Sequence, residues 1–148
     1  MPTPKQYLFP SLPILLIVGL CACSTISRFD QYAYSQATSI KVDALSLMDV
    51  ATEPFQQHQA ASASVMTAID KIYEYEKNRP RNSISEKMWG LLRDTSGHLY
   101  GGFVKRWQRE GTLDPVFIQE SKRLIGYSFD QISQLESGKI KTAQAITQ

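Results

Sequence analysis

Cysteine is nearly absent from this chain. The 148 residues include two cysteines, Cys21 and Cys23, and none follows them. Residues 24–148 therefore cannot form an internal disulfide bond, even in an oxidising compartment. A domain built from these residues must obtain its stability from the packing of apolar side chains.

Residues that would indicate catalysis or metal binding are also scarce. The chain has two histidines, His58 and His98, and neither follows a glutamate by three residues, as the Glu-x-x-His motifs of di-iron bundles require. The Cys-x-x-Cys-His haem motif and the Gly-x-Ser-x-Gly nucleophile motif are both missing. Asp94 and His98 are the one pair at a spacing that could share a cation across a helical turn, but we prefer to interpret this spacing as an exposed ion pair or helix-surface contact. We therefore expect that the protein is not an enzyme, and that it holds no metal ion and no cofactor apart from a covalent lipid.

Charge and hydropathy exclude further classes of protein. The chain has 16 cationic and 14 acidic side chains, a formal net charge of +2, and this near-neutral balance argues against nucleic acid as a partner. β-Branched and polar residues do not alternate over a convincing length, so no strand is expected. The N-terminal apolar run is well short of the roughly 20 residues that a transmembrane helix needs.

The most informative feature that is present lies at the N-terminus. Lys5 is followed by the apolar run LPILLIVGL at residues 12–20, which has the length of the hydrophobic region of a secretory signal. The next residues complete the sequence Leu20-Cys21-Ala22-Cys23, which resembles the lipobox of bacterial lipoproteins: a leucine, a variable residue and a small residue before the lipidated cysteine.

This resemblance implies a processing site and a location. Residues 1–22 would be a cleaved signal peptide, Cys23 would carry the covalent lipid, and residues 23–148 would be the mature domain. Ser24 resembles the residue found after the lipidated cysteine in lipoproteins of the outer membrane. We therefore expect a protein that is anchored in membrane lipid at the cell outer membrane and faces the periplasm.

The mature chain has the apolar periodicity of helices. Apolar residues recur at spacings of three and four in four stretches, which are separated by proline or glycine. The pattern predicts helices over about 26–51, 54–77, 83–110 and 115–138, followed by a polar, frayed tail over 139–148. Helices of similar length joined by short turns predict an all-α fold, a four-helix up-down-up-down bundle behind the cleaved signal peptide.

The third of these helices contains several glycines. Its apolar spacing keeps its phase between Leu92 and Phe103, so we predict one continuous helix through Gly97–Gly102. Gly97 and Gly101 also match the small-xxx-small pattern of closely packed helices, and we expect a tight helix crossing there. Trp89 and Tyr100 fall outside the main apolar stripe of this helix and are our candidates for partner-facing residues.

An up-down topology would also orient the domain on the membrane. Cys23 would hold the start of the first helix at the bilayer, and the second and fourth helices would return to it. Five cations would then gather near anionic lipid: Arg28, Arg79, Arg81, Lys139 and Lys141. The opposite end, at residues 49–55 and 111–115, would face the periplasm and is our preferred partner surface.

These observations predict a lipid-anchored, periplasm-facing helical binding or scaffold protein, acting as an accessory or assembly factor in a cell-envelope process. Its partners would be membrane lipid and an envelope protein whose identity the sequence does not give. Two alternatives remain open: an exclusion or immunity lipoprotein directed against a phage, plasmid or toxin, and a cofactor-binding helical bundle.

Overall fold

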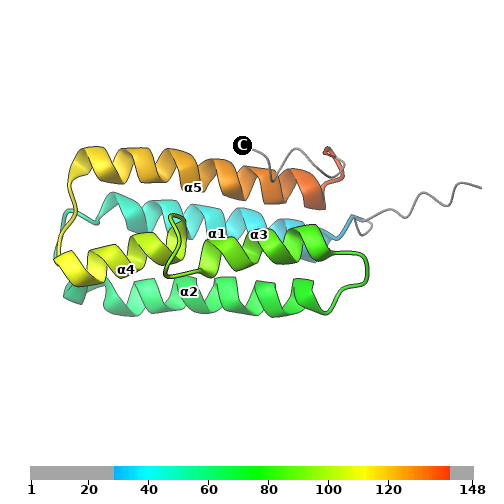
Figure 1. The fold of residues 1–148 in the computed structure, drawn as a ribbon, viewed down its shortest axis with the longest axis horizontal. Coiled ribbons are helices and arrows are strands. Elements are labelled where there is room, and N and C mark those ends of the chain that lie inside the picture. The colour runs from blue at the N-terminus through cyan, green and yellow to red at the C-terminus, as the bar shows by residue number, and fades with distance from the viewer. Residues whose placement is uncertain (1–28, 141–148) are drawn as a thin grey trace, which may run out of the picture.

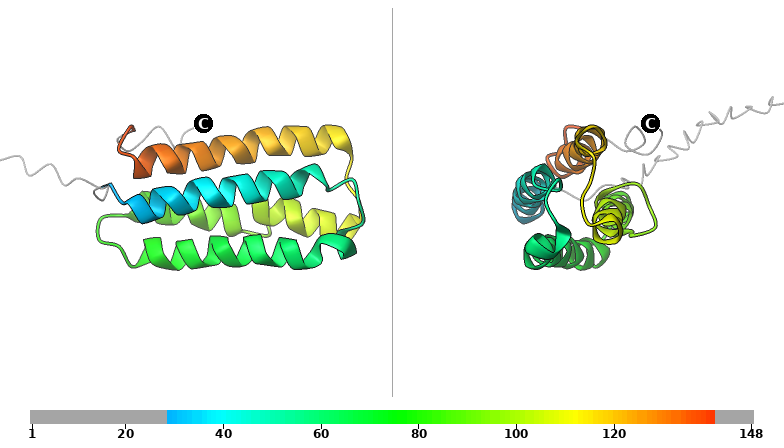
Figure 2. Two further views of the ribbon diagram at one scale, coloured as in Figure 1. Left: turned by 180° about the vertical axis from the view of Figure 1, so that it is seen from behind. Right: turned by 90° about the vertical axis from the view of Figure 1, so that its left-hand side faces the viewer.

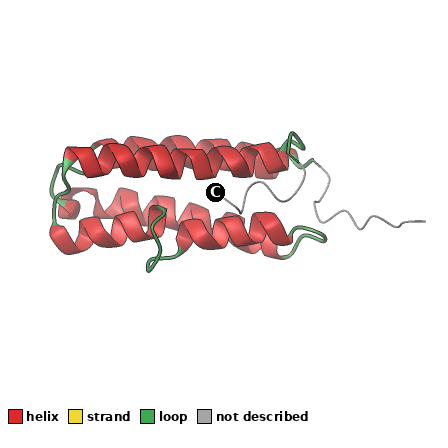
Figure 3. Ribbon diagram, turned by 45° about the horizontal axis from the view of Figure 1, so that its top comes forward, coloured by secondary structure: helices red, strands yellow, loops and turns green. Residues whose placement is uncertain are grey.

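A computed structural model of the chain describes residues 29–140, and these residues form an all-helical bundle (Figures 1 and 3). No strand occurs among them, so the predicted all-α class is confirmed. The described residues form five helices where the sequence predicted four. The helices are α1 (Gln31–Asp49), α2 (Phe55–Lys77), α3 (Ser83–Arg93), α4 (Tyr100–Glu110) and α5 (Pro115–Glu136).

The helices run alongside one another in the direction of the long axis of the molecule (Figures 1 and 2). α1 packs against α2 and α5, and α3 packs against α2 and α5, while α4 follows α3 nearly end to end and packs on α2 and α3. We call one end of the bundle the entry end, where α1 starts, the turn at 78–82 lies and α5 finishes. The opposite end, with the connections at 50–54 and 111–114, is called the far end.

Backbone contacts tie the two connections of the far end together. The amide of Phe55 donates to the carbonyl of Gly111 at 2.8 Å, and the amide of Leu113 donates to the carbonyl of Ala51 at 2.8 Å. The indole Nε1 of Trp107 donates to the carbonyl of Glu53 at 3.0 Å. The connections that precede α2 and α5 are therefore held side by side rather than projecting independently.

Local sequence chemistry explains several helix ends. The side chain of Asp114 accepts hydrogen bonds from the amides of Val116 and Phe117, and Pro115 is the first helical residue, as the sequence predicted. Gly111 follows the last residue of α4 and has a φ of 81°, and Gly138 has a φ of 71° just beyond α5. Glycine adopts this left-handed conformation without the steric cost that other residues meet.

The predicted continuous third helix is wrong, because residues 94–99 interrupt it between α3 and α4. Asp94 has an extended backbone, with a ψ of 114°, and its carboxylate accepts from the amide and the hydroxyl of Ser96. Such a local turn competes with helix formation, and each glycine costs a helix about 1 kcal/mol relative to alanine. The hydrogen bonds from Ser96 to Asp94 and the glycines therefore favour a break over a continuous helix.

Glycine is required where this turn joins α4. A Cβ added to Gly102 would lie 1.8 Å from the carbonyl oxygen of Gly97, and one added to Gly101 would lie 2.4 Å from the carbonyl oxygen of Arg93. Gly101 of α4 thus approaches the last residue of α3, and Gly102 approaches the connection between the two helices, so the predicted close approach occurs where the chain turns from α3 into α4. The glycines let the chain fold back on itself before α4 begins.

The core runs the length of the bundle. Leu92 and Phe129 are completely buried, and the ring of Trp89 meets that of Phe129 edge-on, with 5.9 Å between ring centres. Near the far end, the ring of Phe55 packs edge-on against Trp107 with 5.4 Å between centres. Edge-to-face aromatic pairs of this kind stabilise a core beyond the effect of their buried area.

Candidate functional site

The residues predicted to face a partner are instead part of the core. Trp89 and Tyr100 are 0% and 1% exposed, so the prediction that they form a partner surface is wrong. Trp89 packs on Phe129 of α5, and the large apolar residue that α3 exposes is Leu91, which is 57% exposed. The connection at 94–99 changes the helical phase, which turns Tyr100 inward at the start of α4. Burial raises the pKa of the Tyr100 hydroxyl well above its usual range.

The predicted membrane-proximal cations have different surroundings. Cys23, Arg28 and Lys141 lie outside the described residues. Arg81 and Lys139 are exposed at the entry end, as expected for cations that could meet a surface. Arg79, by contrast, is mostly buried, because its side chain points into a group of acidic residues.

We call this group the Arg79 cluster. Nη1 of Arg79 lies 2.8 Å from the Glu76 carboxylate and 2.9 Å from the Glu136 carboxylate, and Nε lies 3.7 Å from the Asp30 carboxylate. The amide of Asn82 donates to Glu76, and the hydroxyl of Ser85 donates to Glu136. The members are Asp30, Glu76, Arg79, Asn82, Ser85 and Glu136, and they come from the start of α1, from α2, from the turn and α3, and from α5.

The Arg79 cluster buries two carboxylates next to one guanidinium. Glu76 is 0% and Glu136 is 3% exposed. Burial, followed by repulsion from Glu136, raises the pKa of Glu76 from 4.5 to about 7, although Arg79 and Asn82 act in the opposite direction. At the surface of the cluster, the amide of Ala33 and then the hydroxyl of Tyr75 lower the pKa of Asp30 by donating hydrogen bonds to its carboxylate.

Aromatic side chains gather on the outside of the same end. Phe29, Tyr32, Tyr34 and Tyr75 are all exposed, and we call them the entry-end aromatic cluster. The rings of Tyr32 and Tyr75 meet edge-on with 4.9 Å between their centres, and those of Phe29 and Tyr34 are 6.4 Å apart. An exposed group of neighbouring aromatic rings is unusual for a surface that meets only water.

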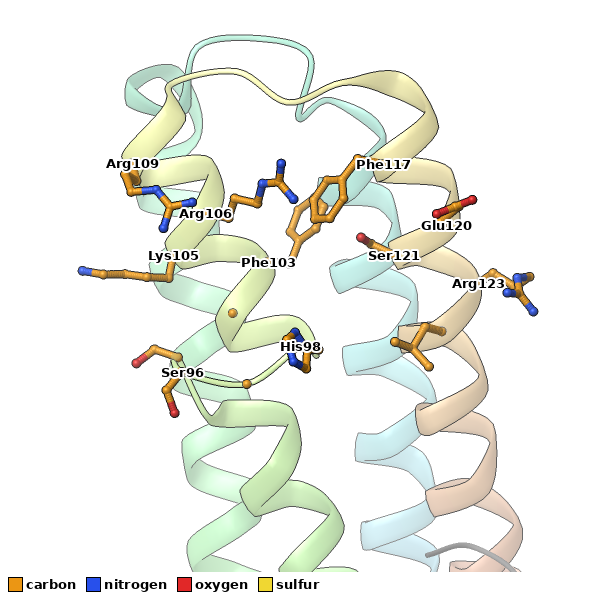
Figure 4. Close-up of a pocket in the computed structure, with 14 residues that line it drawn as sticks. Ser96, His98, Phe103, Lys105, Arg106, Arg109, Phe117, Glu120, Ser121 and Arg123 are labelled. Carbon is orange, nitrogen blue, oxygen red and sulfur yellow. The ribbon is translucent and has the colours of Figure 1, made fainter. Parts of the chain in front are cut away.

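A pocket of about 570 Å³ lies on the other half of the molecule, between α4 and α5 (Figure 4). It exists because α5 packs closely on α1 and α3, whereas α4 packs mainly on α2 and α3. The pocket extends from the connection at 94–99 along α4 to Arg109. We call it the α4–α5 groove.

The α4–α5 groove has an aromatic floor. The rings of Phe103 and Phe117 are stacked, with 6.0 Å between their centres and an angle of 5° between their planes. In Figure 4 they lie between the two helices, with His98 further along the groove toward the connection. Leu124 extends the apolar surface and is 46% exposed, so this part of the floor is open to solvent.

Cationic residues line this groove on both of its flanking helices. Four cationic residues line the groove, Lys105, Arg106 and Arg109 from α4 and Arg123 from α5, against one acidic residue, Glu120. The Arg106 guanidinium lies 3.9 Å from the centre of the Phe117 ring.

Some of this charge is balanced by Glu110. Arg106 and Arg109 both pair with its carboxylate, and the bonds from Arg109 and then Arg106 lower the pKa of Glu110. Lys105 and Arg123 have no ion-pair partner within residues 29–140. These two side chains are therefore the cations most available to a ligand.

Sequence reasoning missed the α4–α5 groove, although its residues were visible. Lys105, Arg106 and Arg109 stand near the end of a helix, where cations are favourable without any ligand, and Phe103 and Phe117 fit the apolar spacing of core residues. The combination of two aromatics with cations on both flanking helices was the available signal. This signal is informative only once the break after Arg93 is known, because the break lets α4 diverge from α5.

Residues 29–140 include no group of three or more histidine, cysteine or acidic side chains that could hold a metal ion. Asp94 and His98 both lie in the α3–α4 connection, where Asp94 bonds to Ser96. In the same range, every helix is too short or too polar to cross a bilayer. Comparisons with known proteins found no matching family model, no matching curated protein and no matching solved structure.

Proposed function

We propose that this protein is a lipid-anchored, periplasm-facing binding or scaffold protein that serves as an accessory or assembly factor in a cell-envelope process. The proposal assigns the covalent lipid to Cys23 and includes no catalytic step and no other cofactor. It places the entry end toward the outer membrane and the α4–α5 groove away from it.

The observation that carries the proposal is the surface of the entry end. Cys23 precedes Phe29 by six residues, and six residues span at most about 22 Å when fully extended. A lipid on Cys23 would therefore keep the entry end close to the bilayer. Tyrosine is enriched at membrane–water interfaces, where the ring meets apolar groups and the hydroxyl stays hydrated. Three exposed tyrosines and Phe29 at this end suit such a position.

We also infer an up-down-up-down arrangement in which α3 and α4 together take the place of one broken helix. This arrangement is supported by contacts at both ends. Arg79 brings the start of α1, the end of α2 and the end of α5 together, and the bond from Phe55 to Gly111 joins the two connections at the far end. A partner approaching from the periplasm would then meet the far end and the α4–α5 groove first.

Metabolic labelling tests the anchor directly. We expect Cys23→Ala to abolish incorporation of labelled palmitate and to block cleavage of residues 1–22. The matched variant Cys21→Ala should be labelled and processed like the natural chain, because only Cys23 occupies the acceptor position of the lipobox-like sequence. Unchanged labelling of the Cys23→Ala variant, or its loss in Cys21→Ala alone, would remove the basis of the proposal.

A further inference from the structure

We infer that the α4–α5 groove binds an acidic, amphipathic segment of a partner protein, with apolar side chains on the aromatic floor and carboxylates at the cationic edges. This inference deepens the proposed binding function by naming the site and the chemistry of the partner. It rests on three properties of the groove: its length, its floor and its charge.

The length of the groove suits a protein segment. It follows α4 from the preceding connection to Arg109, and the ten helical residues from Tyr100 to Arg109 span about 14 Å. Two helices that run side by side in opposite directions flank it, which is the geometry of surfaces that accept an amphipathic helix or an extended peptide. A segment of two to three helical turns would match this length.

The floor provides an apolar contact that is open to solvent. Phe117 is half-buried, and Leu124 has nearly half of its surface exposed. Covering such side chains removes apolar area from water, which favours association. An apolar side chain of the partner would lie against Leu124 and the exposed part of Phe117, next to the Arg106 guanidinium that contacts the same ring.

The charge at the edges selects an acidic partner. Lys105 on α4 and Arg123 on α5 line the groove from its two flanking helices, and in Figure 4 their side chains extend outward from the floor, at its outer edges. Neither is engaged by a carboxylate within the described part of the chain, so neither has to leave an existing ion pair before it binds a ligand. Charges placed in this way favour association with the complementary sign and disfavour basic partners.

The test is a selection followed by matched variants. The full chain, solubilised in detergent, is immobilised and used to select from a phage-displayed library of random 16-residue peptides. We expect the selected peptides to carry more Asp and Glu than Lys and Arg, with apolar residues at a spacing of three or four. Their binding, measured by fluorescence anisotropy of the synthetic peptides, should weaken as salt is added.

Charge reversal at the edges then locates the site. Lys105→Glu with Arg123→Glu should weaken peptide binding about tenfold or more, since two attractions become repulsions. Lys71→Glu with Lys87→Glu makes the same change of charge at exposed positions outside the groove and should leave binding within twofold. Thermal melting confirms that both double variants are folded.

Truncation of the floor gives an independent check. Leu124→Ser should weaken binding several-fold, while Leu91→Ser, at a similarly exposed leucine of α3 outside the groove, should not. The inference is overturned by peptides without acidic bias, by no selected peptide at all, or by equal binding to both double variants. It is also overturned if vesicles containing phosphatidylglycerol bind through Lys105 and Arg123 while acidic peptides do not. None of these results changes palmitate labelling at Cys23, so the anchor and the groove succeed or fail separately.

Discussion

At the scale of single residues, the most unusual environment belongs to Glu76. Its carboxylate is completely buried and shares the Arg79 guanidinium with Glu136, so two acidic groups face one cation. Asp30 touches the same guanidinium from the outside, and the nearby Asn82 and Ser85 side chains are neutral donors. Burial of the carboxylate, followed by repulsion from Glu136, raises the pKa of Glu76 to about 7, and protonation of Glu76 relieves both effects.

This raised pKa predicts that the folded protein loses stability as the pH rises. The pKa of Glu76 is about 7 in the fold and 4.5 in an ordinary environment, so between these values the folded state holds more protons than the unfolded state. The free energy of unfolding then falls with increasing pH over this window and levels off above about pH 7. We expect a total loss on the order of 2 kcal/mol between pH 5 and pH 8, measured by urea denaturation.

Two variants isolate Glu76 from other groups that titrate in the same range. Glu76→Gln should flatten the dependence of unfolding free energy on pH, because the side chain can no longer release a proton. Glu74→Gln, at an exposed position two residues earlier on α2, should retain the dependence of the natural chain. Stability that rises from pH 5 to pH 8, or an unchanged slope in Glu76→Gln, would contradict this account.

At the scale of secondary-structure elements, the break between α3 and α4 determines the shape of the molecule. It separates two short helices of 11 residues each, and it lets α4 leave the surface of α5 that α3 occupies. The α4–α5 groove is the result. The break depends on Gly101 and Gly102, where an added Cβ would collide with the backbone of Arg93 and of Gly97.

Replacement of Gly102 should therefore lower the free energy of unfolding, whereas replacement of Gly90 should not. Gly102→Ala places a methyl group against the carbonyl of Gly97, and we expect it to lower the free energy of unfolding by roughly 1–3 kcal/mol, as overpacked sites do. Gly90→Ala, in the middle of α3, meets only the Tyr73 ring at 3.7 Å and should raise stability by up to about 1 kcal/mol. Thermal melts of both variants test the contrast, and equal melting temperatures would refute it.

The break also shows which parts of the fold the sequence could predict. The start of α5 was predicted correctly because Asp114 and Pro115 act on their immediate neighbours, and Gly111 likewise acts locally. The connection at 94–99 was not predicted, because Leu92, Leu99 and Phe103 keep a helical spacing across it. Periodicity records which residues are apolar, and it does not record whether the backbone between them is helical.

The same limit applies to the candidate surfaces. The core positions of Leu92 and Phe129 follow from spacing alone, and both are buried. Whether Trp89 faces solvent or α5 depends on the direction from which another helix approaches, and this is a property of packing. The burial of Arg79 was missed for a related reason, since Glu136 lies 57 residues further along the chain. Contacts between distant segments of this kind have no local signal.

At the scale of the whole molecule, the two ends of the bundle differ in chemistry. The entry end combines the entry-end aromatic cluster with exposed Arg81 and Lys139, whereas the α4–α5 groove opens on the half of the bundle toward the far end. This polarity suits a molecule that is held at one end and binds with the other half.

The entry end should bind lipid even without the acyl chain. Residues 24–148, produced without a lipid, should associate with vesicles that contain anionic lipid, and Phe29→Ser with Tyr32→Ser should weaken this association several-fold, because the exposed rings no longer enter the interface. Val42→Ser with Val116→Ser removes equally exposed apolar groups elsewhere and should have little effect. Vesicle co-sedimentation measures both. Equal weakening in the two double variants would show that the aromatic cluster has no special role.

The Arg79 cluster has a mechanical consequence for a molecule tethered through its N-terminal segment. In the anchored protein that we propose, tension would reach the fold at Phe29 and Asp30, immediately before α1. Arg79 connects Asp30 to the end of α2 and, through Glu136, to the end of α5. A pulling force that enters at Asp30 is therefore passed on to two further helices. Peeling α1 away from the bundle would require Asp30 to separate from Arg79 and from the Tyr75 hydroxyl, so the point of attachment is cross-linked to the rest of the fold.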